Sequence, residues 1–210
     1  MKKINLFGEK SYFYIDSLKY KNKNVLLKNI KSRYNKSPNL KPDNWPESVH
    51  TSIQHKNCKD NYQYFELSGI PLDLVVLINQ KVQDLIEIEG LQDIGEFYIS
   101  EMWYNAYRNG QYQNRHKHSN RYNIFFSGVY YLEIDEEHSS TRFYNPAFEV
   151  CFEKILNLEF FTFSPKVKNN NLIIFPSGVP HDVTSQHSRK LRVTISFNVR
   201  CIFNEHINYS

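Results

Sequence analysis

Cysteine is scarce in this sequence of 210 residues, which contains only Cys58, Cys151 and Cys201. The three are odd in number, and none stands in a Cys-x-x-Cys pair, the spacing typical of cysteine zinc sites and redox motifs. Small secreted domains that are held together by disulfides carry a much denser set. The sequence therefore indicates neither a disulfide framework nor a cysteine zinc site, and we expect all three thiols to be reduced and structural.

Long apolar runs are missing as well. No stretch approaches the roughly 20 apolar residues that a membrane-spanning helix needs. The first eight residues, Met-Lys-Lys-Ile-Asn-Leu-Phe-Gly, lack the apolar core of a signal peptide. We therefore expect a cytoplasmic protein without a membrane partner.

Neither sign of charge dominates, since 26 basic side chains face 22 acidic ones and the formal net charge is +4. A nucleic-acid-binding protein usually carries a denser basic stripe, interleaved with aromatic residues or placed on a recognition helix. The basic residues between positions 19 and 41 could form one, but a solvated helix face is the interpretation that we favour. Nucleic acid is thus not expected as a partner, and the sequence does not indicate an oligomeric state.

Aromatic residues are abundant, with 15 Tyr and 15 Phe, and hydrophobic residues make up 40% of the chain. This composition is typical of a globular fold, and Tyr and Phe favour strands and the walls of cavities. The length favours a single domain over two. We expect residues 1–96 to be a preface of helices and strands, 97–200 a jelly-roll core, and 201–210 a tail.

Helical periodicity is confined to the first half of the chain. Residues 23–34 carry apolar side chains at helical spacing opposite a lysine-rich side, after a short strand at 12–15. A longer helix is predicted between Pro71 and Gly90, with one apolar stripe that would cover a sheet, formed by Leu74, Val75, Ile78, Val82, Leu85 and Ile86. Three prolines between Ser37 and Glu47 predict an extended loop.

Strand patterns fill the rest of the sequence. Strands are predicted at 49–53 and 62–67, and then at 97–107, 124–134, 141–145, 157–163, 172–175 and 191–199, with a turn at Asn109-Gly110. The last strand alternates cleanly, so that Arg192 and Ser196 share one face and would look into a polar cavity. Helices followed by many strands predict an α+β, mainly β fold, a jelly roll with the N-terminal helices packed outside the sheet.

Three histidines are candidate metal ligands. On an extended segment, residues i and i+2 project to the same face, so His116 and His118 can both reach one ion. His181 follows Phe-Pro-Ser-Gly-Val-Pro, a rigid turn after a predicted buried strand. The other five histidines lack comparable settings and are interpreted as exposed loop residues: His50, His55, His138, His187 and His206.

Imidazole suits iron, zinc, copper or nickel, and three protein ligands leave positions open for catalysis. Because three neutral histidines would leave a divalent ion with its full charge, such an ion would favour an anionic bidentate ligand. The fork of donors on Arg192 could pair with the far carboxylate of that ligand. An edge arginine that bridges to a surface acid is the alternative for this residue.

Several separate motifs, in order, resemble the Fe(II)/2-oxoglutarate-dependent oxygenases, and in particular the uncharacterised prolyl-hydroxylase-like branch of phages and bacteria. The resemblance covers roughly residues 97–200. The motifs are Trp-Tyr-Asn-Ala-Tyr-Arg-Asn-Gly at 103–110, His-Lys-His at 116–118, Ser-Gly-Val-Tyr-Tyr-Leu at 127–132, Phe-Pro-Ser-Gly-Val-Pro-His at 175–181 and Arg-Val-Thr-Ile-Ser-Phe-Asn at 192–198. A phage-encoded protein of this kind would act in the host cytoplasm.

The resemblance implies a cupin-like double-stranded β-helix that binds Fe(II) and 2-oxoglutarate as cofactors. By motif position, His116, His118 and His181 would be the metal ligands, and Arg192 would hold the distal carboxylate of 2-oxoglutarate. Three further positions match residues that support this carboxylate, namely Tyr107, Tyr131 and Ser196; ordinary strand packing is the alternative for the two tyrosines. The sequence departs from the superfamily at His118, where an acid is usual, and at Ser119, where this branch commonly has proline.

The function implied is an oxygenase that couples oxidative decarboxylation of 2-oxoglutarate to hydroxylation of a substrate, which is a protein side chain, a nucleotide or a small metabolite. Two alternatives stay open. One is a three-histidine cupin-type metalloenzyme that does not use 2-oxoglutarate. The other is a jelly-roll binding module without catalysis, because one fold hosts many functions.

Overall fold

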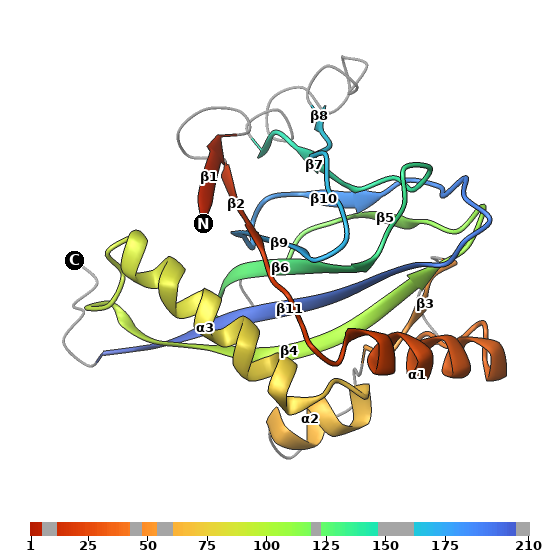
Figure 1. The fold of residues 1–210 in the computed structure, drawn as a ribbon. Helices are drawn as coiled ribbons and strands as arrows, with labels where there is room; N and C mark the ends of the chain where they lie inside the picture. Colours follow the sequence, from red (N-terminus) through yellow and green to blue (C-terminus); the bar gives the residue numbers. More distant parts are fainter. Residues whose placement is uncertain (6–11, 43–47, 54–60, 119–122, 147–161, 205–210) are drawn as a thin grey trace.

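Two antiparallel β-sheets face each other, and three helices cover the outer side of the larger one (Figure 1). The computed structural model describes residues 1–5, 12–42, 48–53, 61–118, 123–146 and 162–204. The larger sheet has seven strands in the order β1-β2-β9-β6-β11-β4-β3, and the smaller has four in the order β5-β10-β7-β8. The predicted jelly roll with N-terminal helices outside it is confirmed.

Three long strands, β4, β6 and β11, lie next to one another in the larger sheet. The strands of this sheet are β1 (Lys2–Asn5), β2 (Tyr12–Ser17), β3 (His50–Thr51), β4 (Gly95–Tyr107), β6 (Ile124–Glu133), β9 (Asn171–Pro176) and β11 (Arg192–Phe203). The smaller sheet consists of β5 (Gln113–His116), β7 (Thr141–Tyr144), β8 (Thr162–Phe163) and β10 (His181–Val183). Strand β11 pairs with β4 on one side and β6 on the other, so it is an interior strand of the larger sheet.

The helices are α1 (Lys23–Lys36), α2 (Asn61–Ser68) and α3 (Leu72–Ile88). The predicted stripe of α3 is confirmed, because all six of its apolar residues are buried. They join a core cluster with Met102, Tyr104, Ile195 and Phe197 of the central strands. A second cluster fills the space between the two sheets and includes Phe13, Tyr131, Phe143 and Phe175. The core therefore has two layers, one under the helices and one between the sheets.

A glycine in β6 allows close packing at the centre of the larger sheet. Gly128 lies opposite Phe197 of β11 in the strand register. A Cβ at position 128 would come within 2.1 Å of the Phe197 ring, well inside van der Waals contact. Only glycine leaves room for this ring, which lies on the helix-covered side of the sheet.

The predicted strand at 62–67 is wrong, because α2 occupies this stretch. Tyr64, Phe65 and Ser68 are buried at positions i, i+1 and i+4, which is one face of a helix. Gly69, at φ +73°, then ends the helix, with Gly69 N–H donating to the Glu66 carbonyl and Ile70 N–H to the Phe65 carbonyl. These two bonds form a Schellman motif, a helix stop that the apolar pattern does not reveal.

Other boundaries differ modestly from the predictions. The strand expected at 49–53 is reduced to the two residues of β3, and of the one expected at 157–163 only β8 falls within the described residues. The loop predicted at 37–47 contains no helix or strand over 37–42, and 43–47 lie outside the described residues. None of the described helices is both long and apolar enough to span a bilayer.

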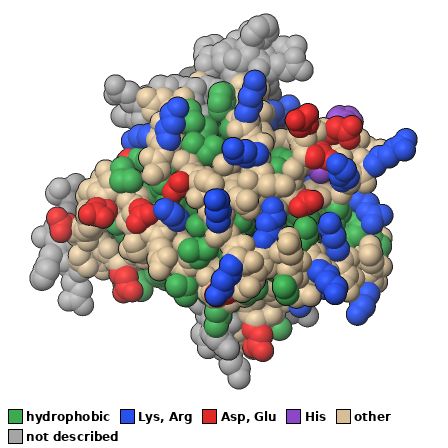
Figure 2. Space-filling model, in the orientation of Figure 1, with side chains coloured by type: hydrophobic (Ala, Val, Ile, Leu, Met, Phe, Trp, Pro, Cys, Tyr) green, Lys and Arg blue, Asp and Glu red, His purple; other side chains and the backbone are tan. Residues whose placement is uncertain are grey.

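The basic residues around α1 lie at the surface, as predicted. Lys28, Lys31 and Lys36 are exposed, whereas Leu27 and Ile30 of the same helix are buried. In Figure 2, blue side chains are frequent on the side of the molecule where Figure 1 places α1. The amphipathic pattern thus assigns the apolar side of the helix to the core and its lysines to solvent.

Two of the five histidines interpreted as exposed loop residues are buried instead. His50 is 0% exposed and lies between the rings of Tyr34 and Tyr104, at 4.9 and 5.6 Å between centroids. His138 is 8% exposed, and its Nε2 lies 3.0 Å from the Lys190 carbonyl. His187 is exposed, and His55 and His206 lie outside the described residues. The sequence pattern could not distinguish these cases, because the burial of short segments depends on what packs over them.

Of the three cysteines, the described part of the chain contains Cys201, which is buried and not in a disulfide. This agrees with the predicted structural role. Cys58 and Cys151 lie outside the described residues.

Candidate metal centre

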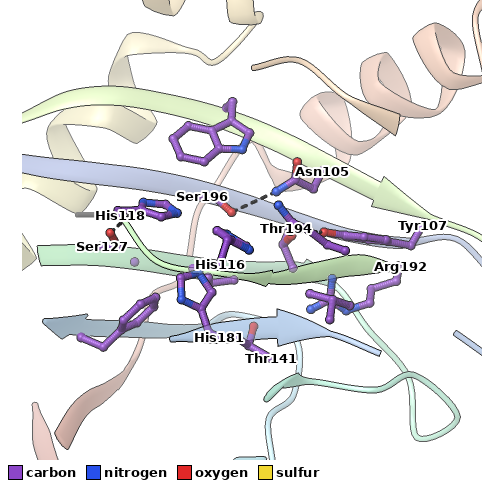
Figure 3. A pocket seen from close by; sticks show the side chains of 16 residues that line it. Asn105, Tyr107, His116, His118, Ser127, Thr141, His181, Arg192, Thr194 and Ser196 are labelled. Atoms are coloured by element: carbon purple, nitrogen blue, oxygen red, sulfur yellow. Dashed lines mark hydrogen bonds between the residues drawn. The ribbon is translucent and has the colours of Figure 1, made fainter. Parts of the chain in front are cut away.

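The three candidate histidines meet between the two sheets. His116 ends β5 and His181 begins β10, and the two residues are partners in the antiparallel register. His118 follows β5, and its backbone N–H donates to the Ser177 carbonyl at 3.0 Å. One ring nitrogen from each residue lies within 4.8 Å of the others. The i, i+2 spacing and the Pro-containing turn therefore bring the three imidazoles together, as Figure 3 shows.

The hydrogen bonds of the imidazoles fit metal binding. The Nδ1 atom of His116 lies 2.8 Å from the Asn114 carbonyl, and that of His181 lies 3.0 Å from the Val179 carbonyl. A carbonyl oxygen can only accept, so both Nδ1 atoms carry a proton, and in the neutral ring Nε2 is the nitrogen that offers a lone pair. For His118, Nδ1 lies 2.5 Å from Oδ1 of Asn198. Metal-binding histidines commonly donate their second nitrogen in this way.

Burial keeps two of these imidazoles neutral. It lowers the pKa of His118 to about 4, and the neighbouring His116 contributes to the shift. Burial, with His116 and His118 as further causes, holds the pKa of His181 well below its usual value. A metal ion at neutral pH would therefore not compete with a proton for these two rings.

Aromatic side chains restrain the imidazoles. The Phe175 ring meets the His181 ring edge to face at 4.8 Å between centroids, and the Trp103 ring lies 6.2 Å from that of His118. Such packing limits the rotation of the rings and excludes water from one side of the centre.

The other end of the same cavity holds Arg192. Its side chain is fully buried, and none of its three guanidinium nitrogens has a hydrogen-bond partner among the described residues. The guanidinium carbon lies 4.9 Å from the centroid of the Tyr107 ring and 5.7 Å from that of Tyr131. A buried cation without hydrogen bonds is costly unless a ligand pairs with it. This orphaned guanidinium faces the space between the strands and fits the carboxylate of an acidic ligand.

No acidic side chain lines the cavity among the residues that the structure describes. The walls combine histidines, hydroxyls and amides with the apolar side chains of Val129, Phe175 and Val183. A divalent ion on the three imidazoles and the guanidinium of Arg192 would therefore share one low-dielectric space without a balancing anion among the described residues. The charge pattern favours a dianion that reaches both ends.

The other predicted site residues have different surroundings. The Tyr107 hydroxyl donates to Oε1 of Gln113 at 2.9 Å, and Ser196 Oγ accepts a hydrogen bond from Nδ2 of Asn105 at 3.1 Å. Both Tyr107 and Ser196 line the cavity. Tyr131 is not among the lining residues; its hydroxyl donates to Oγ1 of Thr141 at 2.9 Å.

Sequence reasoning missed several lining residues. Asn105 and Thr194 could have been found, because they alternate with Tyr107 on β4 and with Arg192 and Ser196 on β11. Gln113 and Thr141 carry no comparable signal, since they reach the cavity from short strands of the smaller sheet.

A jelly roll in which three clustered histidines share a cavity with a buried arginine defines a class of protein, a metal-binding barrel with a place for an acidic cosubstrate. Residues 101–198 match the model of a family described as "Putative 2OG-Fe(II) oxygenase". The match covers just under half of the chain, and it supports a 2OG-Fe(II) oxygenase with Fe(II) and 2-oxoglutarate as metal and cosubstrate. Three histidines and an unpaired arginine fit both. No curated protein sequence matches the chain significantly.

Solved structures share the fold at low sequence identity. A prolyl-4-hydroxylase from Pseudomonas putida has a TM-score of 0.56 at 14% identity, over 90% of this chain and 92% of that one. The viral collagen prolyl hydroxylase of Paramecium Bursaria Chlorella virus-1, in complex with 2OG, has a TM-score of 0.56 at 12% identity, over 94% of this chain and 99% of that one. HygX from Streptomyces hygroscopicus, with nickel and 2-oxoglutarate bound, has a TM-score of 0.53 at 8% identity, over 92% of this chain and 84% of that one.

Proposed function

We propose that His116, His118 and His181 hold Fe(II) and that Arg192 binds the distal carboxylate of 2-oxoglutarate in a dioxygenase of unidentified substrate. The observation that carries this proposal is the buried guanidinium, which has no hydrogen-bond partner in the described part of the chain and shares a cavity with the three imidazoles. A cupin-type enzyme without 2-oxoglutarate would have no use for that guanidinium. A binding module without a metal would not need three imidazoles around one point.

Each residue has a distinct task in this proposal. The imidazoles offer three Nε2 lone pairs, and the metal supplies oxygen activation coupled to oxidative decarboxylation of 2-oxoglutarate. Arg192 orients the cosubstrate through its planar fork. Tyr107 and Tyr131 hold the guanidinium between their rings, and the hydroxyl of Thr194, two residues along β11, lines the path between the two ends. Ser196 and Asn105 form the neighbouring polar wall.

The single-domain organisation is part of the proposal. Residues 1–96 contribute helices and edge strands to the same core that β4 and β11 form, which supports a unit that folds together. A cytoplasmic location, or the host cytoplasm for a phage protein, agrees with the reduced Cys201. The substrate is a protein side chain, a nucleotide or a small metabolite, and the lysines of α1 are taken as a solvated face rather than a nucleic-acid site.

The decisive test is an anaerobic titration of the purified protein with Fe(II) and 2-oxoglutarate. Cosubstrate bound beside the metal is expected to give a weak visible charge-transfer band, and His116→Ala and His181→Ala should each abolish it. A succinate-release assay over a panel of substrates then searches for turnover. Absence of the band in a protein that also retains no metal would rule the proposal out.

Arg192→Leu separates this function from a three-histidine enzyme that does not use 2-oxoglutarate. We expect the variant to keep its metal and to lose the band at cosubstrate concentrations that saturate the wild type. Equal bands in both proteins would mean that the guanidinium has no part in binding 2-oxoglutarate.

A further inference from the structure

A carboxylate lies behind His118, one residue removed from the metal centre. Glu101 of β4 is the strand partner of Asn198 of β11. The Nδ2 group of Asn198 donates to Oε2 of Glu101 at 2.7 Å, and Oδ1 of the same amide lies 2.5 Å from Nδ1 of His118. The Arg200 guanidinium lies 3.6 Å from the other oxygen of Glu101. The three residues therefore form a relay from Glu101 through Asn198 to His118.

The relay fixes the direction of every hydrogen bond in it. An ionised carboxylate can only accept, so the NH2 end of the Asn198 amide must face Glu101. The Oδ1 end then faces His118 and can only accept in turn. Nδ1 of His118 must carry the proton, which leaves Nε2 free for a metal. Ser127 Oγ lies 3.0 Å from both Nδ1 and Oδ1, but a hydroxyl can donate or accept and so does not decide the orientation.

His118 differs in this respect from the other two histidines. The tautomers of His116 and His181 are set by backbone carbonyls, which cannot turn round. The tautomer of His118 depends on an amide that could rotate by 180° if nothing held it. His118 is also the position at which an acid is usual in the wider superfamily.

We propose that Glu101 and Asn198 are positioning residues that select the metal-binding tautomer of His118 and hold a negative charge behind it. The inference rests on the proposed role of His118 as a metal ligand. The carboxylate that is missing from the ligand set is thus present as an outer partner, connected to the imidazole through the amide. Outer partners of this kind typically change metal affinity by about 10–100-fold when they are removed.

The first test is Glu101→Gln, which preserves shape but can present an NH2 group to the Asn198 amide. Asn198 can then turn its own NH2 towards His118, where Nδ1 would accept and Nε2 would carry the proton. We expect Co(II) affinity, measured by competition with a chromophoric chelator, to fall by about 10–100-fold. Glu96→Gln is the matched control, because it makes the same change at an exposed position of the same strand.

The second test reverses the loss. In the double variant Glu101→Gln with Asn198→Asp, the glutamine can donate to the new carboxylate, which accepts from Nδ1 of His118. The metal-binding tautomer is restored with the charge one residue closer, and we expect Co(II) affinity to return to within about threefold of the wild type. A purely structural role of Glu101 would not predict rescue, and thermal unfolding of each variant checks that the fold is intact.

Histidine 15N NMR of the metal-free protein reads the tautomer directly. We expect a proton on Nδ1 of His118 in the wild type and on Nε2 in a substantial fraction of Glu101→Gln. The same tautomer in both proteins, or equal Co(II) affinity in Glu101→Gln and Glu96→Gln, would overturn the inference. A wild type that binds no Co(II) would instead contradict the proposed function, and the NMR comparison would still decide the role of the relay.

Discussion

The two faces of β11 present opposite chemistry from alternate residues of one strand. Val193, Ile195, Phe197 and Val199 point to the helix-covered side and belong to the larger core cluster. Arg192, Thr194 and Ser196 line the cavity between the sheets. The apolar face packs against side chains of this chain, whereas the polar face carries a guanidinium without a hydrogen-bond partner among the described residues. The comparison teaches that stability and binding are assigned to different faces of the same element.

The largest expected effect on stability comes from the apolar face. Phe197→Ala removes a fully buried ring and leaves a cavity beside Gly128, so we expect the free energy of unfolding to fall by about 3–5 kcal/mol. Ser196→Ala on the opposite face removes one acceptor from Asn105 and should cost only about 1 kcal/mol. Denaturant unfolding of both variants measures the contrast. Similar losses of unfolding free energy for the two variants would mean that the apolar face of β11 does not contribute more to stability than its polar face.

Arg192→Met is expected to move stability and binding in opposite directions. Replacing a buried cation that lacks hydrogen bonds with an apolar side chain of similar length should raise the stability of the ligand-free protein by about 1–3 kcal/mol. Binding of 2-oxoglutarate to the Co(II)-loaded protein should weaken by about 2–5 kcal/mol. Calorimetry measures the binding, and thermal unfolding measures the stability.

Arg192→Lys is the matched control for this pair of effects. It keeps the charge and loses the planar fork, so 2-oxoglutarate affinity should fall between those of the wild type and Arg192→Met. A ligand-free Arg192→Met protein that is less stable than the wild type would show that Arg192 supports the fold rather than the ligand.

A smaller effect on stability is expected from His50, which is buried beside Tyr34 of α1. Burial lowers the pKa of this imidazole, so the unfolded chain takes up a proton near its usual pKa of about 6.5 while the folded protein resists it. The unfolded state then binds more protons, and stability is lost as the pH falls below about 6.5. We expect His50→Gln to have a flatter dependence of unfolding free energy on pH between 7 and 5.5. Parallel curves for the two proteins would contradict the burial argument.

Much of the fold was predictable where a long element has one apolar side. The stripe of α3 and the alternation of β4, β6 and β11 follow from the match between side-chain spacing and the geometry of a half-buried element. The strand predicted at 62–67 was wrong because a short segment with adjacent aromatic residues fits a strand or a helix equally well. The Schellman motif at Gly69 and Ile70 decides between them, and it consists of backbone bonds that no side-chain pattern displays.

The sequence by itself determined which residues could carry chemistry, because each of them is marked by a local feature. These features are the i, i+2 spacing of His116 and His118, the rigid turn before His181 and the alternating strand that contains Arg192. Only the tertiary structure decided that these four residues share one cavity, that the arginine has no hydrogen-bond partner among the described residues, and that Glu101 lies behind His118 through Asn198. The physical reason is that sheet register joins segments nearly 100 residues apart, and the hydrogen bonds that orient an imidazole come from whatever strand lies next to it.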